Sequence, residues 1–317
     1  MARSRAEQSS SGAQAERASC YLAKMKILLI GARGQLAQDL VRVAAEAGAG
    51  DEIVPVTHEQ LDIRNAAELN ICVKRARPDC VINTAAFHRV DLCEDEPDNA
   101  FAVNEQGVLN VARATQGGRA LLVQFSTDYV FDGEKRTPYV ETDEARPLSV
   151  YGRSRLAGER AVQAACERYL IIRTCGLYGL AGSQSKAGNF VETMLRLGGS
   201  GRPFKVVEDQ VCTPTSSFDL AYHLLPMIRG RAQGVFHMTN TGECSWHEFA
   251  QRIFAMSGMS AKLEACSTAE YAAKAKRPAY SALDTQALRA AGFQELRPWQ
   301  EALAEYLRSR RSATVSG

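Results

Sequence analysis

The sequence of 317 residues lacks the features that mark several classes of protein. No apolar run approaches the roughly 20 residues that a membrane-crossing helix needs, so no partner membrane is expected. The net charge is only +2, which gives no electrostatic reason to expect nucleic acid or an anionic membrane surface as a partner. No internal repeat is visible.

The nine cysteines form no pattern of a zinc site or a disulfide framework. They are scattered singly, their number is odd, and no C-x-x-C pair or matching His spacing accompanies them. We therefore expect reduced thiols that act as small buried hydrophobic residues, in a cytoplasmic protein. The acidic residues form no metal-ligand cluster either, so no metal ligand is predicted, and a requirement for Mg²⁺ cannot be read from the sequence.

What is present is typical of a globular protein, with 45% hydrophobic and 23% charged residues. This length allows one large domain or two modest ones that share a cleft. The first 24 residues are rich in Ser, Ala, Gln and Arg and have no apolar core of a secretory signal. We expect a disordered extension there and a folded chain that begins at Met25.

From Met25 on, short apolar runs alternate with helical patterns. Strands are predicted at 26–30, 52–56, 79–83, 120–125 and 169–173, and helices from the first loop through 47 and at 65–76, 99–115 and 151–167. The run Lys26–Ile30 is apolar without alternation, as in a parallel strand covered on both faces. This order predicts an α/β fold with a doubly wound parallel Rossmann sheet.

After Arg173 the alternation ends and stretches rich in Gly and Ser appear. A helix at 217–228 and a strand at 234–238 are expected to return to the sheet, whereas 245–256, the segment from 262, and 299–307 would build a smaller lobe. The predicted parts are a dinucleotide-binding domain (25–174 with 216–240), a discontinuous substrate lobe (175–215 and 241–310) and a tail (311–317). The polar sequence from Arg308 on is expected to fray.

The segment Gly31-x-x-Gly34-x-x-Ala37 lies between a buried strand and a helix, the context of a dinucleotide-binding loop. Gly31 would permit the tight turn, Gly34 would let the backbone approach a pyrophosphate, and Ala37 would allow close packing of helix on strand. The helix N-terminus would then supply N–H groups to the phosphate.

The choice between NADPH and NADH is left open, with a slight lean to NADPH. The second strand ends at Thr57-His58 without the carboxylate that would bind a ribose 2′-hydroxyl. Arg33 could meet a 2′-phosphate, or it could be a solvated cation of the loop. Asp62 follows later and is expected beside the adenine.

Two segments together suggest a reaction centre. The apolar strand that ends at Ser126-Thr127-Asp128 would bring hydroxyls and a carboxylate to the edge of the sheet, and the helix that opens with Tyr151 carries Arg155 one turn later. Free tyrosine has a pKa of about 10, so a phenol that works near neutral pH benefits from a neighbouring cation. This is the equipment for giving a proton to a carbonyl while a nicotinamide cofactor supplies hydride.

Further motifs occur in the same order along the chain. They are Gly-x-x-Gly-Gln-Leu, Asp62-Ile63, Asn83-x-Ala85-Ala86, Val90-Asp91-x-x-Glu94, Ser126–Gly133, Tyr151-Gly152-x-Ser154-x-x-x-Gly158-Glu159 and Asp209-Gln210-x-x-x-Pro214-Thr215. With them the chain resembles the dTDP-4-dehydrorhamnose reductase family of extended short-chain dehydrogenases/reductases. The resemblance covers about 25–307 and implies reduction of the C4 keto group of a nucleotide-sugar, dTDP-4-dehydro-6-deoxy-L-mannose, to dTDP-L-rhamnose.

The resemblance implies a role for individual residues. Tyr151 would be the proton donor with Thr127 as its hydrogen-bonding partner and Arg155 as its supporting cation, and Thr127 and Asp128 would touch the sugar. The predicted cofactor-binding residues, from the loop and the resemblance together, are Gly31, Gly34, Gln35, Leu36, Asp62, Ile63, Ala85, Ala86, Phe87, His88, Tyr151 and Arg155. Gly176 and Arg277 complete the predicted substrate site, Arg277 either on the diphosphate or as an ordinary surface arginine.

The chain also departs from the family at informative positions. Arg155 stands where the family has lysine, and Gly176 stands where many members have tryptophan. Tyr129 follows Asp128 where a related 4,6-dehydratase would have Glu, which favours a simple reductase. Two alternatives stay open: a non-catalytic NAD(P)-binding regulatory subunit like that of methionine adenosyltransferase, and a reductase or epimerase of another nucleotide-sugar. A homodimer is also left open.

Overall fold

The computed structural model describes residues 24–48, 50–181 and 188–315. Its centre is a six-stranded parallel sheet in the order β10-β5-β4-β3-β1-β2. The strands are β1 Lys26–Ile30, β2 Glu52–Val56, β3 Cys80–Asn83, β4 Leu121–Thr127, β5 Tyr169–Thr174 and β10 Gly234–His237. The order reverses at β1, between β2 and β3, so the predicted doubly wound Rossmann sheet is confirmed.

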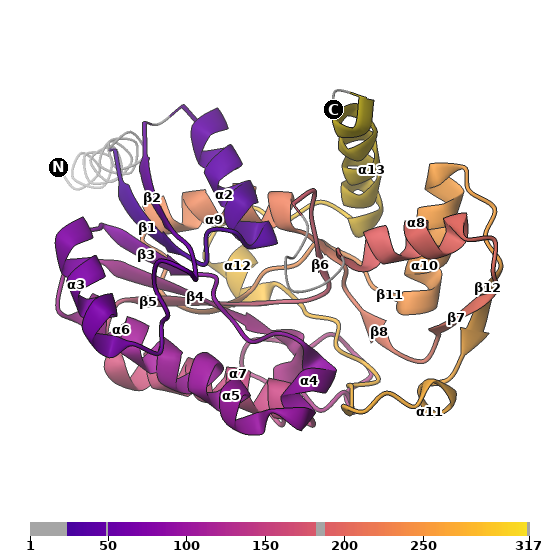
Figure 1. Cartoon of the computed structure of the whole chain (residues 1–317), viewed down its shortest axis with the longest axis horizontal. Coiled ribbons are helices and arrows are strands. Elements are labelled where there is room, and N and C mark those ends of the chain that lie inside the picture. The colour runs from indigo at the N-terminus through magenta and orange to yellow at the C-terminus, as the bar shows by residue number, and fades with distance from the viewer. Residues whose placement is uncertain (1–23, 49, 182–187, 316–317) are drawn as a thin grey trace, which may run out of the picture.

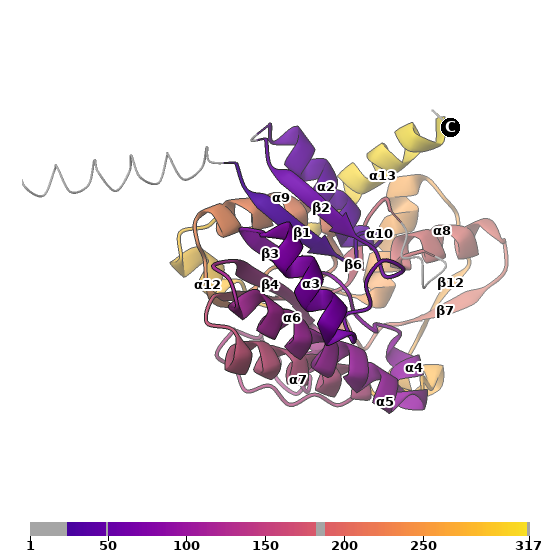
Figure 2. The same cartoon turned by 60° about the vertical axis from the view of Figure 1, so that its left-hand side comes forward.

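Helices cover both faces of this sheet (Figures 1 and 2). On one face lie α2 Gln35–Glu46, α9 Ser217–Arg229 and α12 Gln286–Ala290, and on the other lie α3 Ala66–Ala76, α6 Val108–Gln116 and α7 Val150–Ala165. Successive side chains of a strand point to opposite faces, so Ile27 and Leu29 pack under α2 and α9 while Leu28 and Ile30 pack under α3 and α6. Both faces of β1 are therefore buried, as its unbroken apolar run indicated.

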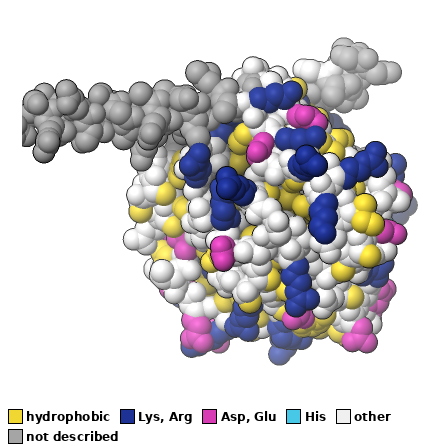
Figure 3. All heavy atoms as spheres, turned by 90° about the vertical axis from the view of Figure 1, so that its left-hand side faces the viewer, with side chains coloured by type: hydrophobic (Ala, Val, Ile, Leu, Met, Phe, Trp, Pro, Cys, Tyr) yellow, Lys and Arg dark blue, Asp and Glu magenta, His cyan; other side chains and the backbone are white. Residues whose placement is uncertain are grey.

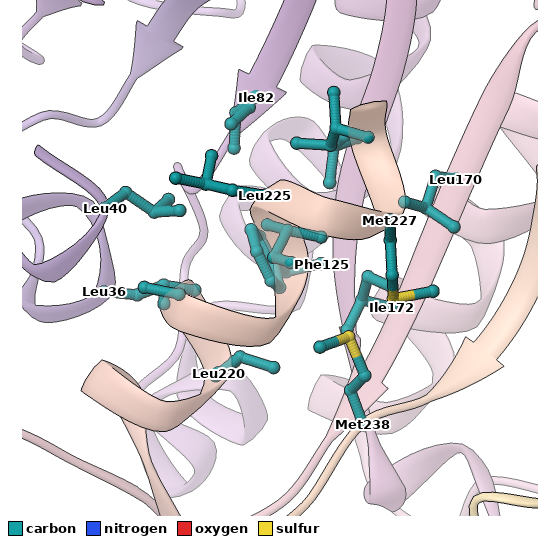
Figure 4. Close-up of a cluster of buried hydrophobic side chains, with 14 of the residues drawn as sticks. Leu36, Leu40, Ile82, Phe125, Leu170, Ile172, Leu220, Leu225, Met227 and Met238 are labelled. Carbon is teal, nitrogen blue, oxygen red and sulfur yellow. The ribbon is translucent and has the colours of Figure 1, made fainter. Parts of the chain in front are cut away.

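The larger apolar cluster lies between the sheet and α9 (Figure 4). Phe125 and Ile172 from the sheet meet Leu220 and Leu225 of α9, and Leu40 joins them from α2. The late elements α9 and β10 thus lie with the sheet, where β10 pairs with β5. The chain after β5 thus returns to the sheet and adds an edge strand beside β5.

The helix predicted at 99–115 is interrupted in its middle. It consists of α5 Pro97–Phe101, a π-helical segment Ala102–Gly107, and α6. A Cβ at Gly158 of α7 would lie 2.2 Å from the Asn104 carbonyl oxygen, so α7 packs directly on this segment. Single π turns often occur at functional positions, and here the segment turns the Asn104 side chain towards the loop after β3.

A small lobe lies to one side of the sheet, on the right of Figure 1, and has its own apolar core. Tyr178, Phe249 and Leu303 are fully buried in that core. Its elements are α8 Phe190–Gly199, β7 Phe204–Val207, β8 Val211–Cys212, β11 Cys244–Ser245, α10 Trp246–Ser257, β12 Leu263–Cys266, α11 Thr268–Tyr271 and α13 Trp299–Val315. The remaining elements are the pair β6 Leu177–Tyr178 and β9 Thr215–Ser216, the short helix α4 Val90–Asp95, and a 3₁₀ turn Asp128–Val130.

The two predictions about the ends of the chain have different outcomes. We expected a polar tail from Arg308, but α13 continues to Val315 because Arg310 forms a bidentate contact with Glu192 of α8. The predicted extension at 1–24 lies, except for Lys24, outside the described residues. The division into a dinucleotide-binding domain and a substrate lobe stays a prediction.

The surface on the left of Figure 1 carries mixed charge (Figure 3). Lys and Arg side chains are interspersed there with Asp and Glu, and hydrophobic side chains are scattered.

Within the described residues, no helix is long and apolar enough to cross a membrane. The eight cysteines that the structure describes are free thiols, and that same part of the chain brings no three His, Cys, Asp or Glu side chains into a metal-binding group.

A buried ion pair fixes α7 to the sheet and gives a test of stability. Glu159 of α7 accepts two hydrogen bonds from Arg173 of β5, of 2.9 and 2.7 Å, with 2% and 7% of the side chains exposed. Glu159→Gln is expected to lower the free energy of unfolding by about 3 kcal/mol, because the guanidinium stays buried without its counterion. Urea denaturation measures this change. The control Glu144→Gln, at an exposed pair with Arg146, should leave the midpoint unchanged, and equal midpoints for both variants would contradict the prediction.

Candidate active site

The loop after β1 has the geometry that a phosphate needs. Gly31 adopts φ +81°, and a Cβ there would lie 2.7 Å from Thr84 Oγ1 and 2.9 Å from the Ala85 nitrogen. Gly34 is the N-cap residue of α2 and supplies no side-chain oxygen to its first turn. The first N–H groups of α2 therefore face the crevice at the point where the strand order reverses.

The loop after β3 lies beside the phosphate loop and contains four predicted cofactor residues, Ala85 to His88. Thr84 donates its hydroxyl to the carbonyls of Ile30 and Gly31, and Asn83 accepts the Ala85 N–H. Asn104 holds Phe87 through both its N–H and its carbonyl, each at 2.9 Å. The residues from Ala85 to His88 are partly exposed, so this loop offers an edge to a ligand.

At the end of β2, the candidate cofactor cation is already paired. Arg33 Nη1 lies 2.5 Å from Glu59 Oε1, and more than half of each side chain is exposed. Hydrogen bonds from its own backbone and from Thr57 hold the pKa of the Glu59 carboxyl below its ordinary value, and Arg33 adds a smaller attraction. Glu59 is thus an ionised carboxylate that can accept hydrogen bonds. It lies just after β2, a strand that itself ends without an acidic residue.

Asp62 and Ile63 lie in the loop between β2 and α3. Asp62 accepts from the Arg64 guanidinium at 2.9 and 2.5 Å, which is the main reason that its pKa lies below the ordinary value. Ile63 is 3% exposed and packs in the core against Gly107, and its carbonyl accepts from Asn110. The Asp62 carboxylate is therefore partly accessible, whereas the Ile63 side chain is not.

These residues fit a dinucleotide. The Gly31 turn packs so closely on Thr84 and Ala85 that a Cβ would clash there, and α2, which follows this turn, presents an uncapped N-terminus to a phosphate. Gln35, the first residue of α2, accepts from Asn189 at 3.2 Å, and Leu36 is 6% exposed in the core beneath. Gln35 can thus meet the phosphates while Leu36 supports the helix.

Tyr151 is placed by the first turn of α7. Ser149 caps this helix by accepting the Gly152 N–H at 3.1 Å. Tyr151 is the second helical residue, and Arg155 follows one turn later with its Cζ 5.7 Å from the centre of the Tyr151 ring. Arg155 is 7% exposed and donates to the Phe125 carbonyl of β4. The predicted pairing of a phenol with a fixed cation is present in the geometry.

Several groups compete to set the pKa of Tyr151. Burial has the largest effect and raises this pKa above the ordinary value. The Arg155 guanidinium and a hydrogen bond with the Thr127 hydroxyl oppose that rise, and the negative charge of Asp128 adds to it. Tyr151 is therefore protonated at neutral pH and ready to act as an acid.

Thr127 and Asp128 form one network at the carboxyl end of β4. Thr127 donates to Asp128 Oδ1 at 2.9 Å, while Ser281 and Cys175 donate to Oδ2 at 2.6 and 3.0 Å. Asp128 is 3% exposed, and burial raises its pKa against the opposing hydrogen bonds. Asp128 therefore fastens β4 to the segment that carries Ser281, and its burial leaves little of the carboxylate exposed to a substrate.

Gly176 and Arg277 lie on the side of the small lobe. Gly176 adopts φ +54°, and a Cβ there would lie 3.3 Å from Cη2 of Trp246. Arg277 donates to both oxygens of Asp91, at 3.1 and 2.8 Å. The space beside Gly176 is thus bounded by an indole from α10, and Arg277 has a carboxylate partner of the kind that a diphosphate could replace.

Sequence reasoning missed three residues of this site: Trp246, Asn189 and Ser281. Trp246 is half-buried and packs 4.6 Å from the Phe190 ring, centre to centre. Ser281 and Asn189 reach Asp128 and Gln35 from positions 153 and 154 residues away along the chain. The only sequence signal for them was their place in the predicted lobe.

A phosphate cradle, a tyrosine with its cation and a hydroxyl partner, all at the carboxyl edge of one Rossmann sheet, define an oxidoreductase of the short-chain dehydrogenase/reductase type. The family model described as RmlD substrate binding domain matches residues 25–312. The chain belongs to this family, that of dTDP-4-dehydrorhamnose reductase.

Three relatives illustrate the similarity. The spore coat polysaccharide biosynthesis protein SpsK of Bacillus subtilis is 39% identical over 91% of this chain and 99% of its own length. The crystal structure of a dTDP-4-dehydrorhamnose reductase from Clostridium acetobutylicum is 41% identical with a TM-score of 0.86, over 90% of this chain and all (100%) of that one. The enzyme from Bacillus anthracis in complex with NADP is 37% identical with a TM-score of 0.85, over 90% and 100%.

The Arg33–Glu59 pair leads to a prediction about cofactor preference. Glu59→Gln is expected to shift the ratio of NADPH to NADH affinity about three- to tenfold towards NADPH, because it frees Arg33 for a 2′-phosphate and removes a repelling charge. Arg33→Gln should shift the ratio in the opposite direction. Titration of each cofactor at low salt measures the dissociation constants.

The control for this pair is Glu46→Gln, which alters an ion pair with Arg42 near the far end of α2 and should leave the ratio unchanged. If the ratio of NADPH to NADH affinity shifted in the same direction in the Glu59 and Arg33 variants, the predicted opposite effects of these two side chains on cofactor preference would be wrong.

Proposed function

We propose that this protein reduces the C4 keto group of dTDP-4-dehydro-6-deoxy-L-mannose to give dTDP-L-rhamnose, with NAD(P)H as the hydride donor. The observation that carries the proposal is the placement of Tyr151, Thr127 and Arg155 at the carboxyl end of β4, beside the phosphate loop. Membership of the reductase family, with near-complete coverage of the chain, supports it.

The bound nicotinamide would supply hydride to the carbonyl carbon. This chain supplies the proton: Tyr151 donates its phenolic hydrogen to the oxygen as negative charge develops there. Thr127 orients the phenol by a hydrogen bond, and Arg155 stabilises the phenolate that remains. The Phe125 carbonyl holds Arg155 in this position.

The nucleotide-sugar would lie between the loop after β5 and the small lobe. The Trp246 indole beside Gly176 offers an apolar wall for a deoxysugar, and Arg277 offers a guanidinium for the diphosphate in exchange for Asp91. Asp128 would contact the sugar through Oδ1, which accepts only from Thr127 among the side-chain bonds described above. These substrate contacts are part of the proposal.

Arg155 is the observation that favours a second candidate function. A non-catalytic regulatory subunit needs no proton transfer, and Arg155 replaces the lysine of the active family members. Against this candidate, the Arg155 guanidinium lies 5.7 Å from the centre of the Tyr151 ring and opposes the rise in the pKa of the phenol that burial causes, which is the electrostatic part of the lysine's role. We therefore favour catalysis.

The remaining expectations belong to this proposal. NADPH is preferred slightly over NADH, because Arg33 of the loop after β1 reaches Glu59, just past the end of β2, where a 2′-phosphate would lie. We place the enzyme in the cytoplasm and leave a homodimer as a prediction, to be tested by sedimentation of the purified chain.

Tyr151→Phe is the direct test of the reaction. The rate of NADPH oxidation with dTDP-4-dehydro-6-deoxy-L-mannose should fall about 10²- to 10⁴-fold, because the proton donor is lost. Binding of NADPH, followed by its fluorescence, should stay within about twofold, since the phosphate loop is untouched. Turnover at the wild-type rate in Tyr151→Phe would exclude Tyr151 as the acid. No turnover in the wild type, with the cofactor bound, would support the regulatory alternative or another sugar.

A pH profile tests the role of Arg155. In the reverse direction, with dTDP-L-rhamnose and NADP, the phenolate of Tyr151 is the base, so the rate rises with pH up to the pKa of Tyr151. Arg155→Met removes the charge that opposes the rise of this pKa, so the alkaline plateau should move to higher pH. Arg155→Lys keeps the charge and should keep the wild-type profile. Identical profiles in the Met and Lys variants would exclude electrostatic support by this residue.

A further inference from the structure

The short helix α4 lies between the catalytic helix and the segment 272–282 of the small lobe. On the first side, Glu94 of α4 accepts the N–H of Val150 at 2.8 Å. Val150 is the first residue of α7 and directly precedes Tyr151. With the Ser149 cap, the Glu94 carboxylate thus holds the first turn of the helix that carries the acid.

Apolar packing strengthens the same contact between α4 and the start of α7. Cys93 of α4 is fully buried with Val150 and Ala100, and the rings of Tyr151 and Phe87 pack against this cluster. The Cys93 thiol also donates to the Phe87 carbonyl, at 3.7 Å, on the loop that lies beside the phosphate site. Any movement of α4 therefore moves groups in contact with Tyr151.

On its second side, α4 holds the small lobe. Asp91 accepts from the Arg277 guanidinium at 3.1 and 2.8 Å and from the Ala275 N–H at 3.0 Å. Asp95 pairs with Lys274. The same segment carries Ser281, which donates to Asp128.

Because α4 is short, these contacts determine its position. A helix of six residues is too short to be stable alone, so the contacts at its two sides set its position. One side is the start of α7 and the other is segment 272–282. A displacement of Arg277 is thus passed to Asp91 and, within one helical turn, to Glu94 and Val150.

We propose that Glu94 is a positioning residue for Tyr151, and that α4 couples the placement of segment 272–282 to the catalytic helix. The inference rests on the proposed function of Tyr151 as the acid. A nucleotide-sugar whose diphosphate draws Arg277 away from Asp91 changes the restraint on α4. The first turn of α7 then adjusts at the moment when the substrate is in place.

Two variants of Glu94 test the positioning role. Glu94→Ala removes the acceptor of the Val150 N–H and should lower kcat about ten- to a hundredfold, with KM for both substrates within about threefold, because misplacement of an acid affects the chemical step. Glu94→Gln keeps an oxygen acceptor and should recover most of kcat. A wild-type kcat in Glu94→Ala, or an equal loss in both variants, would overturn the positioning role.

Hydrogen exchange tests the coupling without any turnover. Asp91→Asn weakens the contact between α4 and Arg277, and amides 150–152 should then exchange about tenfold faster than in the wild type. The control Glu52→Gln alters an ion pair with Lys26 at the opposite end of the sheet strands and should leave both kcat and these amides unchanged. Unchanged exchange at 150–152 in Asp91→Asn would overturn the coupling.

The two readouts separate this inference from the proposed function. If the wild-type protein does not reduce the sugar, the proposed function fails, and exchange at 150–152 still decides whether α4 carries the restraint. If the sugar is reduced and Asp91→Asn leaves the exchange unchanged, the coupling fails alone.

Discussion

The buried ion pair of Glu159 with Arg173 ties helix α7, which carries Tyr151, to strand β5 of the sheet. Two turns before Glu159 stands Tyr151, so the distance of the phenol from the end of β4 is set by how α7 is fixed to β5. Gly158 reinforces this fixation, because its lack of a side chain lets α7 touch the Asn104 carbonyl. Asn104 in turn holds the loop beside the phosphate site. The acid, the cofactor loop and the sheet are thus joined through neighbouring residues of a single helix.

Much of this arrangement could be predicted because it depends on local patterns. The bounds of β1 and β2 agree with the prediction; β1 is a continuous apolar run, whereas β2 is an edge strand in which only Val56 is buried. Tyr151 and Arg155 were expected on one face because four residues make about one helical turn. The strand β4 is longer than expected, since Ser126 and Thr127 continue its pairing with β5 although they are polar. Their burial results from the neighbouring strand, which no local pattern reports.

The parts that escaped prediction are contacts between distant segments. Ser281 on Asp128, Arg277 on Asp91 and Asn189 on Gln35 each join residues more than 150 positions apart. Single polar side chains carry no periodicity, so their partners appear only once the small lobe is placed. The same reason explains α13, where charged residues that suggest a frayed end are held by Glu192. Arg155 is a different case: its place was predictable, but its bond to the Phe125 carbonyl depends on the reach of a guanidinium that lysine does not have.

The backbone at Gly176 has a consequence for how the substrate range of this enzyme could change over evolution. Since φ +54° favours glycine there, and Trp246 of α10 lies against the adjacent space, a wall of the proposed sugar site belongs to the small lobe and not to the sheet. A substitution in α10 can therefore reshape the pocket while the acid and its cation keep their places. Selection for a new deoxysugar can act on one lobe without disturbing the chemistry held by the other.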